Sequence, residues 1–200
     1  MPTLRCFAAF MVAALVDARA AAIASEGRGR GRVSQATATV RDVDWMNQTY
    51  ELPDHSFRFV NGRYNDLDED GQCQLCLHIR KIVFGDVDLD GKPDAVLLID
   101  SSLGGAGRSL DGYVFGVVEG KPVLRAEIEG GDRAEGGIQS VEVVSGEVIV
   151  RRFDLGPRDN TCCASRVLIE RWRWSDGKLV RLPGQPRVLK RKPRPWFLTP

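Results

Sequence analysis

The apolar residues of this chain fall into short runs that are separated by glycine, proline and acidic residues. Within the runs, aromatic and β-branched residues either cluster or alternate with polar ones, which is the pattern of β-strands. The runs cover 45–52, 56–60, 78–84, 95–99, 113–118, 123–128, 141–144, 148–153, 166–174 and 178–182. We therefore predict an all-β, mostly antiparallel domain, built as a sandwich, a barrel-like sheet or a twisted meander, with little helix beyond the first 20 residues.

Turn residues between these runs predict where the chain reverses. Ser145-Gly146 and Asp176-Gly177 each separate two strand-like runs, and Asp-Gly is a strong hairpin signal. Glu119-Gly120 with the following Lys-Pro predicts a third turn. In the run 166–174 the alternation changes phase near Glu170, which predicts a β-bulge there.

The first 20 residues have the organisation of a signal peptide. A basic start is followed by an apolar stretch over 6–16 and by the small residues of Ala18-Arg19-Ala20. The apolar stretch is shorter than a bilayer requires, so we expect no transmembrane segment. The alternative is a buried N-terminal helix. We predict a secreted or periplasmic protein with a signal peptide at 1–20, a flexible leader at 21–40, one β-domain at 41–189 and a basic, proline-rich tail at 190–200.

The charge balance is nearly even. The chain has 28 Lys and Arg against 27 Asp and Glu, for a net charge of +1. The predicted signal peptide carries that single excess charge, so the mature chain is formally neutral. Basic residues gather near both ends, where such runs are usually solvated tails. We therefore expect no nucleic-acid partner, and an unknown protein or envelope component in its place.

Four cysteines follow the predicted signal peptide: Cys73, Cys76, Cys162 and Cys163. An even number in an exported chain favours disulfides, and four cysteines allow three pairings. A bond between Cys162 and Cys163 would close a very small ring. We predict two cross-links between the clusters, each closing a loop of roughly 90 residues that is worth about 4 kcal/mol in the chain-entropy model.

An acidic segment supplies the best-defined candidate chemistry. Asp86, Asp88 and Asp90 stand at loop positions 1, 3 and 5, followed by Gly91 for the sharp turn, and then come Lys92 and Asp94 at positions 7 and 9. Calcium takes six to eight oxygen ligands. Carboxylates spaced by two on a curled backbone, with the Lys92 carbonyl, provide such a set. The alternative is an aspartate-rich turn without metal.

The segment Lys81-Ile-Val-Phe-Gly-Asp-Val-Asp-Leu-Asp-Gly-Lys-Pro-Asp-Ala-Val-Leu-Leu-Ile99 resembles the calcium motif of FG-GAP (integrin-type) and VCBS repeats. It departs from an EF-hand, which needs glutamate at position 12, where this chain has Leu97. The resemblance implies a calcium loop that closes a β-hairpin, with ligands from positions 1, 3, 5, 7 and 9. It is confined to this segment, so it implies a site and no β-propeller.

Two fainter signals accompany this loop. Asp66, Asp68 and Asp70 repeat the first half of the pattern and predict either a weaker ion site or, more simply, a solvated acidic turn before Cys73. The elements Trp45-Met-Asn-Gln-Thr-Tyr50, Cys162-Cys163 and Trp172-Arg-Trp-Ser-Asp-Gly-Lys178, together with the acidic loop, are similar to exported bacterial proteins of the LppP/LprE kind. That similarity implies a compartment and little function.

No catalytic residue is assigned, because the chain has only two histidines and no Gly-x-Ser-x-Gly elbow. Our leading hypothesis is an exported, calcium-binding, disulfide-stabilised and non-enzymatic module that binds a partner or the envelope. The rival hypothesis is a thiol protein that uses Cys73, Cys76, Cys162 and Cys163 for disulfide exchange or for zinc or copper. An enzyme that uses its carboxylates for acid–base work is a third option.

Overall fold

The computed structural model describes residues 39–53, 55–105, 107–132, 135–160, 163–183 and 187–190. Throughout this part of the chain the regular structure is β-strand, which confirms the predicted all-β class. No helix among these residues has the length and apolar character needed to cross a membrane. The predicted signal peptide, nearly all of the leader and the tail from residue 191 lie outside the described residues, and so does Cys162.

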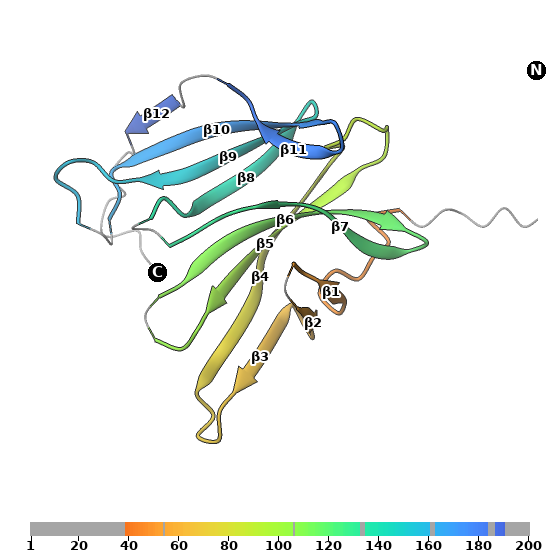
Figure 1. Cartoon of the computed structure of the whole chain (residues 1–200), viewed down its shortest axis with the longest axis horizontal. Coiled ribbons are helices and arrows are strands. Elements are labelled where there is room, and N and C mark those ends of the chain that lie inside the picture. The colour runs from red at the N-terminus through yellow and green to blue at the C-terminus, as the bar shows by residue number, and fades with distance from the viewer. Residues whose placement is uncertain are drawn as a thin grey trace, which may run out of the picture. The chain divides into compact units, whose positions relative to one another are not determined.

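The strands form three antiparallel sheets (Figure 1). The first is a meander in the order β3-β4-β5-β6-β7, and the second has the order β11-β10-β9-β8 with β12 also pairing with β10. A short ribbon joins β1 to β2. The strands are β1 (Thr49–Glu51), β2 (Ser56–Arg58), β3 (Arg63–Leu67), β4 (Cys73–Gly85), β5 (Asp94–Ser102), β6 (Ser109–Val118), β7 (Lys121–Ile128), β8 (Ile138–Val144), β9 (Glu147–Asp154), β10 (Arg166–Ser175), β11 (Lys178–Arg181) and β12 (Arg187–Lys190).

The central strand β5 is buried on both faces. Ala95 and Leu97 pack in one apolar cluster, with Trp45 and other residues of the segment before β3. Val96, between them, packs in a second cluster with residues of β8 and β9, including Val148. The β3–β7 sheet therefore lies between the β8–β11 sheet and the N-terminal segment. Burial on both faces explains why this strand is a continuous apolar run and does not alternate.

Two-residue turns close four of the hairpins. At each of them a non-glycine residue with φ 51° precedes a glycine with φ between 72° and 78°. Positive φ at both central residues is the type I′ pattern, whose twist matches that of the flanking strands. The pairs are Asn61-Gly62, Glu119-Gly120, Ser145-Gly146 and Asp176-Gly177. The predicted turns at Glu119, Ser145 and Asp176 are thereby confirmed.

The predicted bulge near Glu170 is wrong. The pairing of β9 with β10 runs without a shift from Arg166 opposite Asp154 to Arg173 opposite Glu147. Glu170 instead occupies an inward position and is buried, with ion pairs to Arg152 and Arg181. The apolar alternation is interrupted because a charged residue occupies a core position. β10 contains no extra residue there.

The edge strands β3 and β12 were not predicted, and β1 is much shorter than the predicted strand at 45–52. β3 is largely polar and exposed, and β12 is a short exposed strand with only two apolar residues, Val188 and Leu189. Neither has the alternating apolar pattern that marks a strand. The predicted run 45–52 contributes only Thr49–Glu51 to β1. Trp45 lies in a turn before it, buried, with its indole N–H donating to the Val40 carbonyl at 2.7 Å. An aromatic residue that fills the core from a turn looks the same in sequence as one in a strand.

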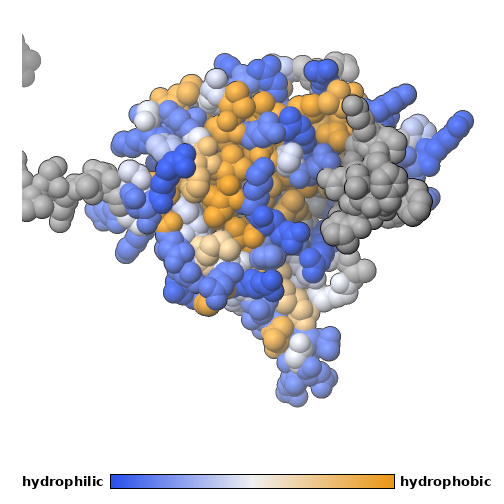
Figure 2. All heavy atoms as spheres, turned by 180° about the vertical axis from the view of Figure 1, so that it is seen from behind, coloured by the Kyte–Doolittle hydropathy of each residue, from blue (hydrophilic) through white to orange (hydrophobic). Residues whose placement is uncertain are grey.

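The β3–β4 hairpin extends away from the rest of the sheet (Figure 1). In the opposite view, apolar side chains gather in the middle of the face, and the hairpin tip projects below them as a hydrophilic extension (Figure 2). The acidic β4–β5 loop lies at the other end of β4, next to the β8–β9 turn. The two candidate chemistries of the chain therefore lie at opposite ends of one long strand.

Candidate metal centre

The acidic loop joins two antiparallel strands. Gly85 at the end of β4 pairs with Asp94 at the start of β5, and residues 86–93 form the connection between them. Leu89 (φ 61°) and Gly91 (φ 85°) are in the left-handed region, which reverses the backbone twice within the loop. Gly85 is needed for another reason: a Cβ there would lie 2.5 Å from Val143 Cγ1 on β8, so only glycine allows this approach.

Three of the predicted carboxylates converge. Asp86, Asp88 and Asp94 each offer one oxygen, and these oxygens lie within 4.8 Å of one another. Asp94 is buried, with 6% of its surface exposed, and Asp86 and Asp88 are half-buried. Among the described residues this is the one group of three or more His, Cys, Asp or Glu side chains with such a spacing.

Backbone amides hold the three side chains in place. The Val87 amide donates to Asp94 Oδ2 at 2.9 Å, and the Gly91 amide donates to Asp86 Oδ2 at 3.0 Å. Asp88 Oδ1 accepts from the Asp90 amide at 3.1 Å. The second oxygen of Asp86, Oδ1, is buried and has no hydrogen-bond partner within the protein. An oxygen removed from water without a partner is costly, so this atom marks the point where the site is chemically incomplete.

The electrostatics of the group favour a cation. Burial raises the pKa of the Asp94 carboxyl above its usual range; the hydrogen bond from the Val87 amide opposes this rise, and the nearby charge of Asp88 adds to it. One counter-charge is present, because Arg125 Nη1 on β7 lies 3.5 Å from Asp88 Oδ2. A single guanidinium against three carboxylates leaves an excess of negative charge.

Asp90 lies outside this group of carboxylates. The backbone carbonyl of Lys92, the fifth predicted ligand, stays a prediction. Asp90 is exposed, and its Oδ1 accepts a hydrogen bond from the Lys92 amide at 2.7 Å. Its carboxylate therefore shapes the turn and does not join the cluster. Arg125 was missed by the sequence analysis, because nothing in a single arginine of an alternating strand indicates that it faces a loop between two other strands.

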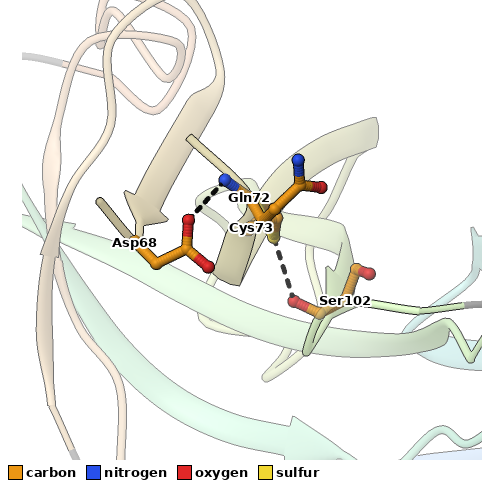
Figure 3. Close-up of a disulfide and its surroundings, with 5 residues drawn as sticks. Asp68, Gln72, Cys73 and Ser102 are labelled. Atoms are coloured by element: carbon orange, nitrogen blue, oxygen red, sulfur yellow. Dashed lines mark hydrogen bonds between the residues drawn. A yellow bond between two sulfur atoms is a disulfide. The ribbon is translucent and has the colours of Figure 1, made fainter. Parts of the chain in front are cut away.

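The second acidic segment forms the turn between β3 and β4. Asp68 Oδ1 accepts a hydrogen bond from the Asp70 amide at 3.0 Å. It also accepts one from the Gln72 amide at 2.7 Å (Figure 3). Asp66 is part of β3 and is exposed. In the described part of the chain these carboxylates belong to no converging group. The segment thus has the geometry of a solvated acidic turn.

The cysteine pairing corrects the predicted cross-links. Cys73 is bonded to Cys76, with their Cα atoms 5.9 Å apart, so neither reaches the second cluster. Cys163 is disulfide-bonded as well, whereas Cys162 lies outside the described residues. The reason is local: Asp66 pairs with Leu75 and Leu67 with Cys73, so Gln74 is skipped and β4 is contracted between the two cysteines.

Comparison of the chain with models of protein families, with curated proteins and with solved structures finds no match.

Proposed function

We propose that this chain is an exported β-domain that binds calcium through Asp86, Asp88 and Asp94 and acts as a binding or envelope-associated module. The observation that carries the proposal is the buried, unpartnered Oδ1 of Asp86 within a group of three converging carboxylates. A bound cation would supply the missing partner of that oxygen. It would also offset the repulsion between Asp88 and Asp94.

The donor set favours a hard cation over a transition metal. All three converging side chains are carboxylates, and no histidine or cysteine joins the group. Carboxylate oxygens suit calcium and magnesium, whereas zinc and copper prefer nitrogen and sulfur. Calcium accepts irregular shells of six to eight oxygens, and magnesium requires a near-ideal octahedron. A hairpin loop with irregular backbone fits the less demanding ion better.

The loop has a structural role that binding would strengthen. It joins β4 to the central strand β5 of the β3–β7 sheet. Leu89 extends from the loop over the β8–β9 turn, where its Cδ2 lies 2.5 Å from the position of a Cβ built on Gly146. An ion held by Asp86, Asp88 and Asp94 would therefore fix the junction between the two larger sheets. We infer a domain whose rigidity depends on calcium in the compartment to which it is exported.

Thermal unfolding with and without calcium tests the proposal. The melting temperature should rise with calcium by mass action, relative to the same protein in chelator. In the double variant D86N/D88N the rise should disappear. D70N is the matched control, since it removes one carboxylate from the β3–β4 turn and should keep the full rise. Superimposable melting curves of the wild-type protein in calcium and in chelator would refute the proposal.

The soft-metal form of the rival hypothesis has no observation in its favour. Zinc or copper held by four cysteines requires four thiolates, and the bond between Cys73 and Cys76 removes two of them. We therefore propose no zinc or copper site.

A further inference from the structure

The Cys73–Cys76 disulfide lines a cavity of about 260 Å³ on the β3–β4 hairpin, at the end of β4 opposite the acidic loop. Both cysteines are half-buried, so a thiol from solution can reach them. Neither belongs to the two apolar clusters of the core. The other residues that line the cavity are Arg63, Asn65, Leu77, His78, Asp100, Ser102 and Arg108.

The position of this disulfide means that it contributes little to the stability of the fold. It joins residues separated by 3 positions in one strand. The stabilisation that a disulfide confers through the unfolded chain grows with the length of the loop it closes. A bond across so short a segment therefore restricts the unfolded chain far less than the cross-link of distant segments that the sequence favoured.

The pairing of β4 with its neighbours β3 and β5 places cations in the row next to Cys76. On β4, Cys76 and His78 lie two residues apart and so share one face of the sheet. Arg63 on β3 is opposite His78, and Asp100 on β5 is opposite it on the other side. Arg108, the residue before β6, reaches this row with its Nη1 at 3.1 Å from Asp100 Oδ2.

The charges that surround the cavity sum to a positive balance. Burial and then the charge of Arg63 lower the pKa of His78 below its ordinary value, so this imidazole adds little positive charge at neutral pH. Asp100 is the one acidic residue in the lining, and it is paired with Arg108 and, at 3.9 Å, with Arg80. Asp68 and Asp70 lie in the turn before Cys73, and the Asp68 carboxylate is occupied by backbone amides of that turn. Arg63 thus lines the same cavity as the disulfide, and no ion pair joins it to an acidic residue in the described part of the chain.

The two sulfur atoms have different surroundings. Cys73 Sγ lies 3.6 Å from the Ser102 carbonyl oxygen (Figure 3). In the reduced protein a Cys73 thiol at this position donates to that carbonyl, which favours its protonated form. Cys76 shares its face with the Arg63 row, and positive charge favours a thiolate. The Ser102 carbonyl therefore favours the thiol form of Cys73, and the row of cations favours the thiolate form of Cys76.

We propose that Cys73–Cys76 is a redox-active disulfide that oxidises a protein dithiol, with Cys76 as the leaving thiolate and with Arg63 and Arg108 as positioning residues. This activity does not depend on calcium. It replaces the expectation of a purely non-enzymatic domain with that of a binding module that also exchanges disulfides.

The exchange balances in two steps. A thiolate of the partner attacks Cys73 Sγ, which forms a mixed disulfide and breaks the bond to Cys76, whose sulfur leaves with the electron pair as a thiolate. The partner's second thiolate then attacks the partner sulfur of the mixed disulfide, which closes the partner's own disulfide and releases Cys73. The partner loses two electrons and two protons. The cysteine pair gains both electrons; one proton goes to Cys73, and the other goes to solvent or to Cys76.

Reduction of the purified full chain by reduced glutathione tests the proposal. The rate is followed by alkylation and mass spectrometry of the peptide that contains Cys73 and Cys76, so that the other cysteines do not interfere. A thiol with a lower pKa leaves faster. R63Q and R108Q should therefore slow the reduction about three- to tenfold. K81Q, which removes an exposed cation of the same strand outside the cavity, should leave the rate unchanged.

Thiolate absorbance provides a second measurement, the pH at which each thiol ionises. This pH would not change if Arg63 had only a structural role. In the reduced C73S variant the thiol of Cys76 should ionise at lower pH than the thiol of Cys73 does in C76S, and R63Q should raise the pH at which Cys76 ionises. The proposal is overturned if the disulfide resists glutathione until the protein unfolds. It is also overturned if R63Q and K81Q react at the same rate, or if the two thiols ionise alike.

Discussion

Arg125 Nη1 lies 3.5 Å from Asp88 Oδ2, so a guanidinium on β7 faces a carboxylate of the β4–β5 loop. The same side chain crosses Gly116 on β6, where a Cβ would come within 2.6 Å of Arg125 Nε. The absence of a side chain at Gly116 thus gives Arg125 its path to the loop. Arg125 is a tethered counter-ion, and a metal ion bound at the proposed site would compete with it for Asp88.

Removal of this counter-ion should therefore strengthen calcium binding. In R125Q the site keeps its three carboxylates and loses the competing charge, and exposed or half-exposed ion pairs are worth up to about 1 kcal/mol. We expect calcium affinity to rise by about three- to fivefold in calorimetric titrations. K121Q removes a cation of the same strand away from the loop and should leave the affinity unchanged. Weaker binding by R125Q would mean that Arg125 supports the ion and does not compete with it.

Because only three carboxylates converge, the aspartates of the loop should contribute unequally to calcium binding. D86N should lower calcium affinity by at least tenfold, because Asp86 carries the buried oxygen without a partner. D90N should lower it less than threefold, since Asp90 is exposed and bonded to the Lys92 amide. The two variants remove the same charge from the same loop, so the comparison is matched. Equal losses would show that all the loop carboxylates join the ion's shell, as the sequence pattern alone implies.

Glu170 should make the stability of the domain sensitive to acid. Burial alone would raise the pKa of Glu170, but the hydrogen bonds and charges of Arg152 and Arg181 outweigh it and hold the pKa below its usual range. An acid whose pKa is lowered on folding stabilises the protein above its unfolded pKa, and this contribution is lost as the pH falls through the folded pKa.

E170Q should accordingly lower the free energy of unfolding at neutral pH by about 2 kcal/mol, the usual cost of losing a charge-assisted hydrogen bond to a buried partner. In strong acid, where Glu170 is protonated in the wild type, the difference between the two proteins should shrink. Urea denaturation at several pH values measures this, and E142Q, which breaks the more exposed pair with Arg151, is the control. A constant difference at all pH values would contradict the assignment.

Gly85 should be intolerant of a side chain. A Cβ at this position would lie 2.5 Å from Val143 Cγ1, so G85A forces β4 and β8 apart. Overpacking of this kind costs about 1–3 kcal/mol. G107A is a matched control, since a Cβ there meets no atom within 4 Å, and it should change stability by less than about 0.5 kcal/mol. Denaturant unfolding of the two variants compares them, and equal stability would contradict the close approach of the two strands.

Local features of the fold were predictable because single residues dictate them. Ser145-Gly146 and Asp176-Gly177 define their turns through backbone preferences that need no partner. The spacing of Asp86, Asp88 and Asp94 likewise places carboxylates around one point as soon as the loop curls. The apolar run at 95–99 indicated a strand for the same local reason, and β5 contains it.

The features that were missed depend on residues distant in sequence. Arg125 meets Asp88 only because three strands pair in register, and Glu170 occupies a core position only because Arg152 and Arg181 neutralise it. The pairing of Cys73 with Cys76 required a contraction of β4, since an extended strand separates residues i and i+3 by about 10 Å. No periodicity in the chain records such a contraction.

Calorimetric titration of the metal-free full chain with calcium measures binding at the proposed site itself. We predict one ion bound per chain through the β4–β5 loop, with a dissociation constant of about 0.1–1 mM, the range of extracellular calcium modules. In the D86N/D88N double variant the binding heat should vanish while the strand content by circular dichroism stays unchanged. A wild-type protein that releases no binding heat up to about 10 mM calcium, far above that range, would show that the loop is not a calcium site.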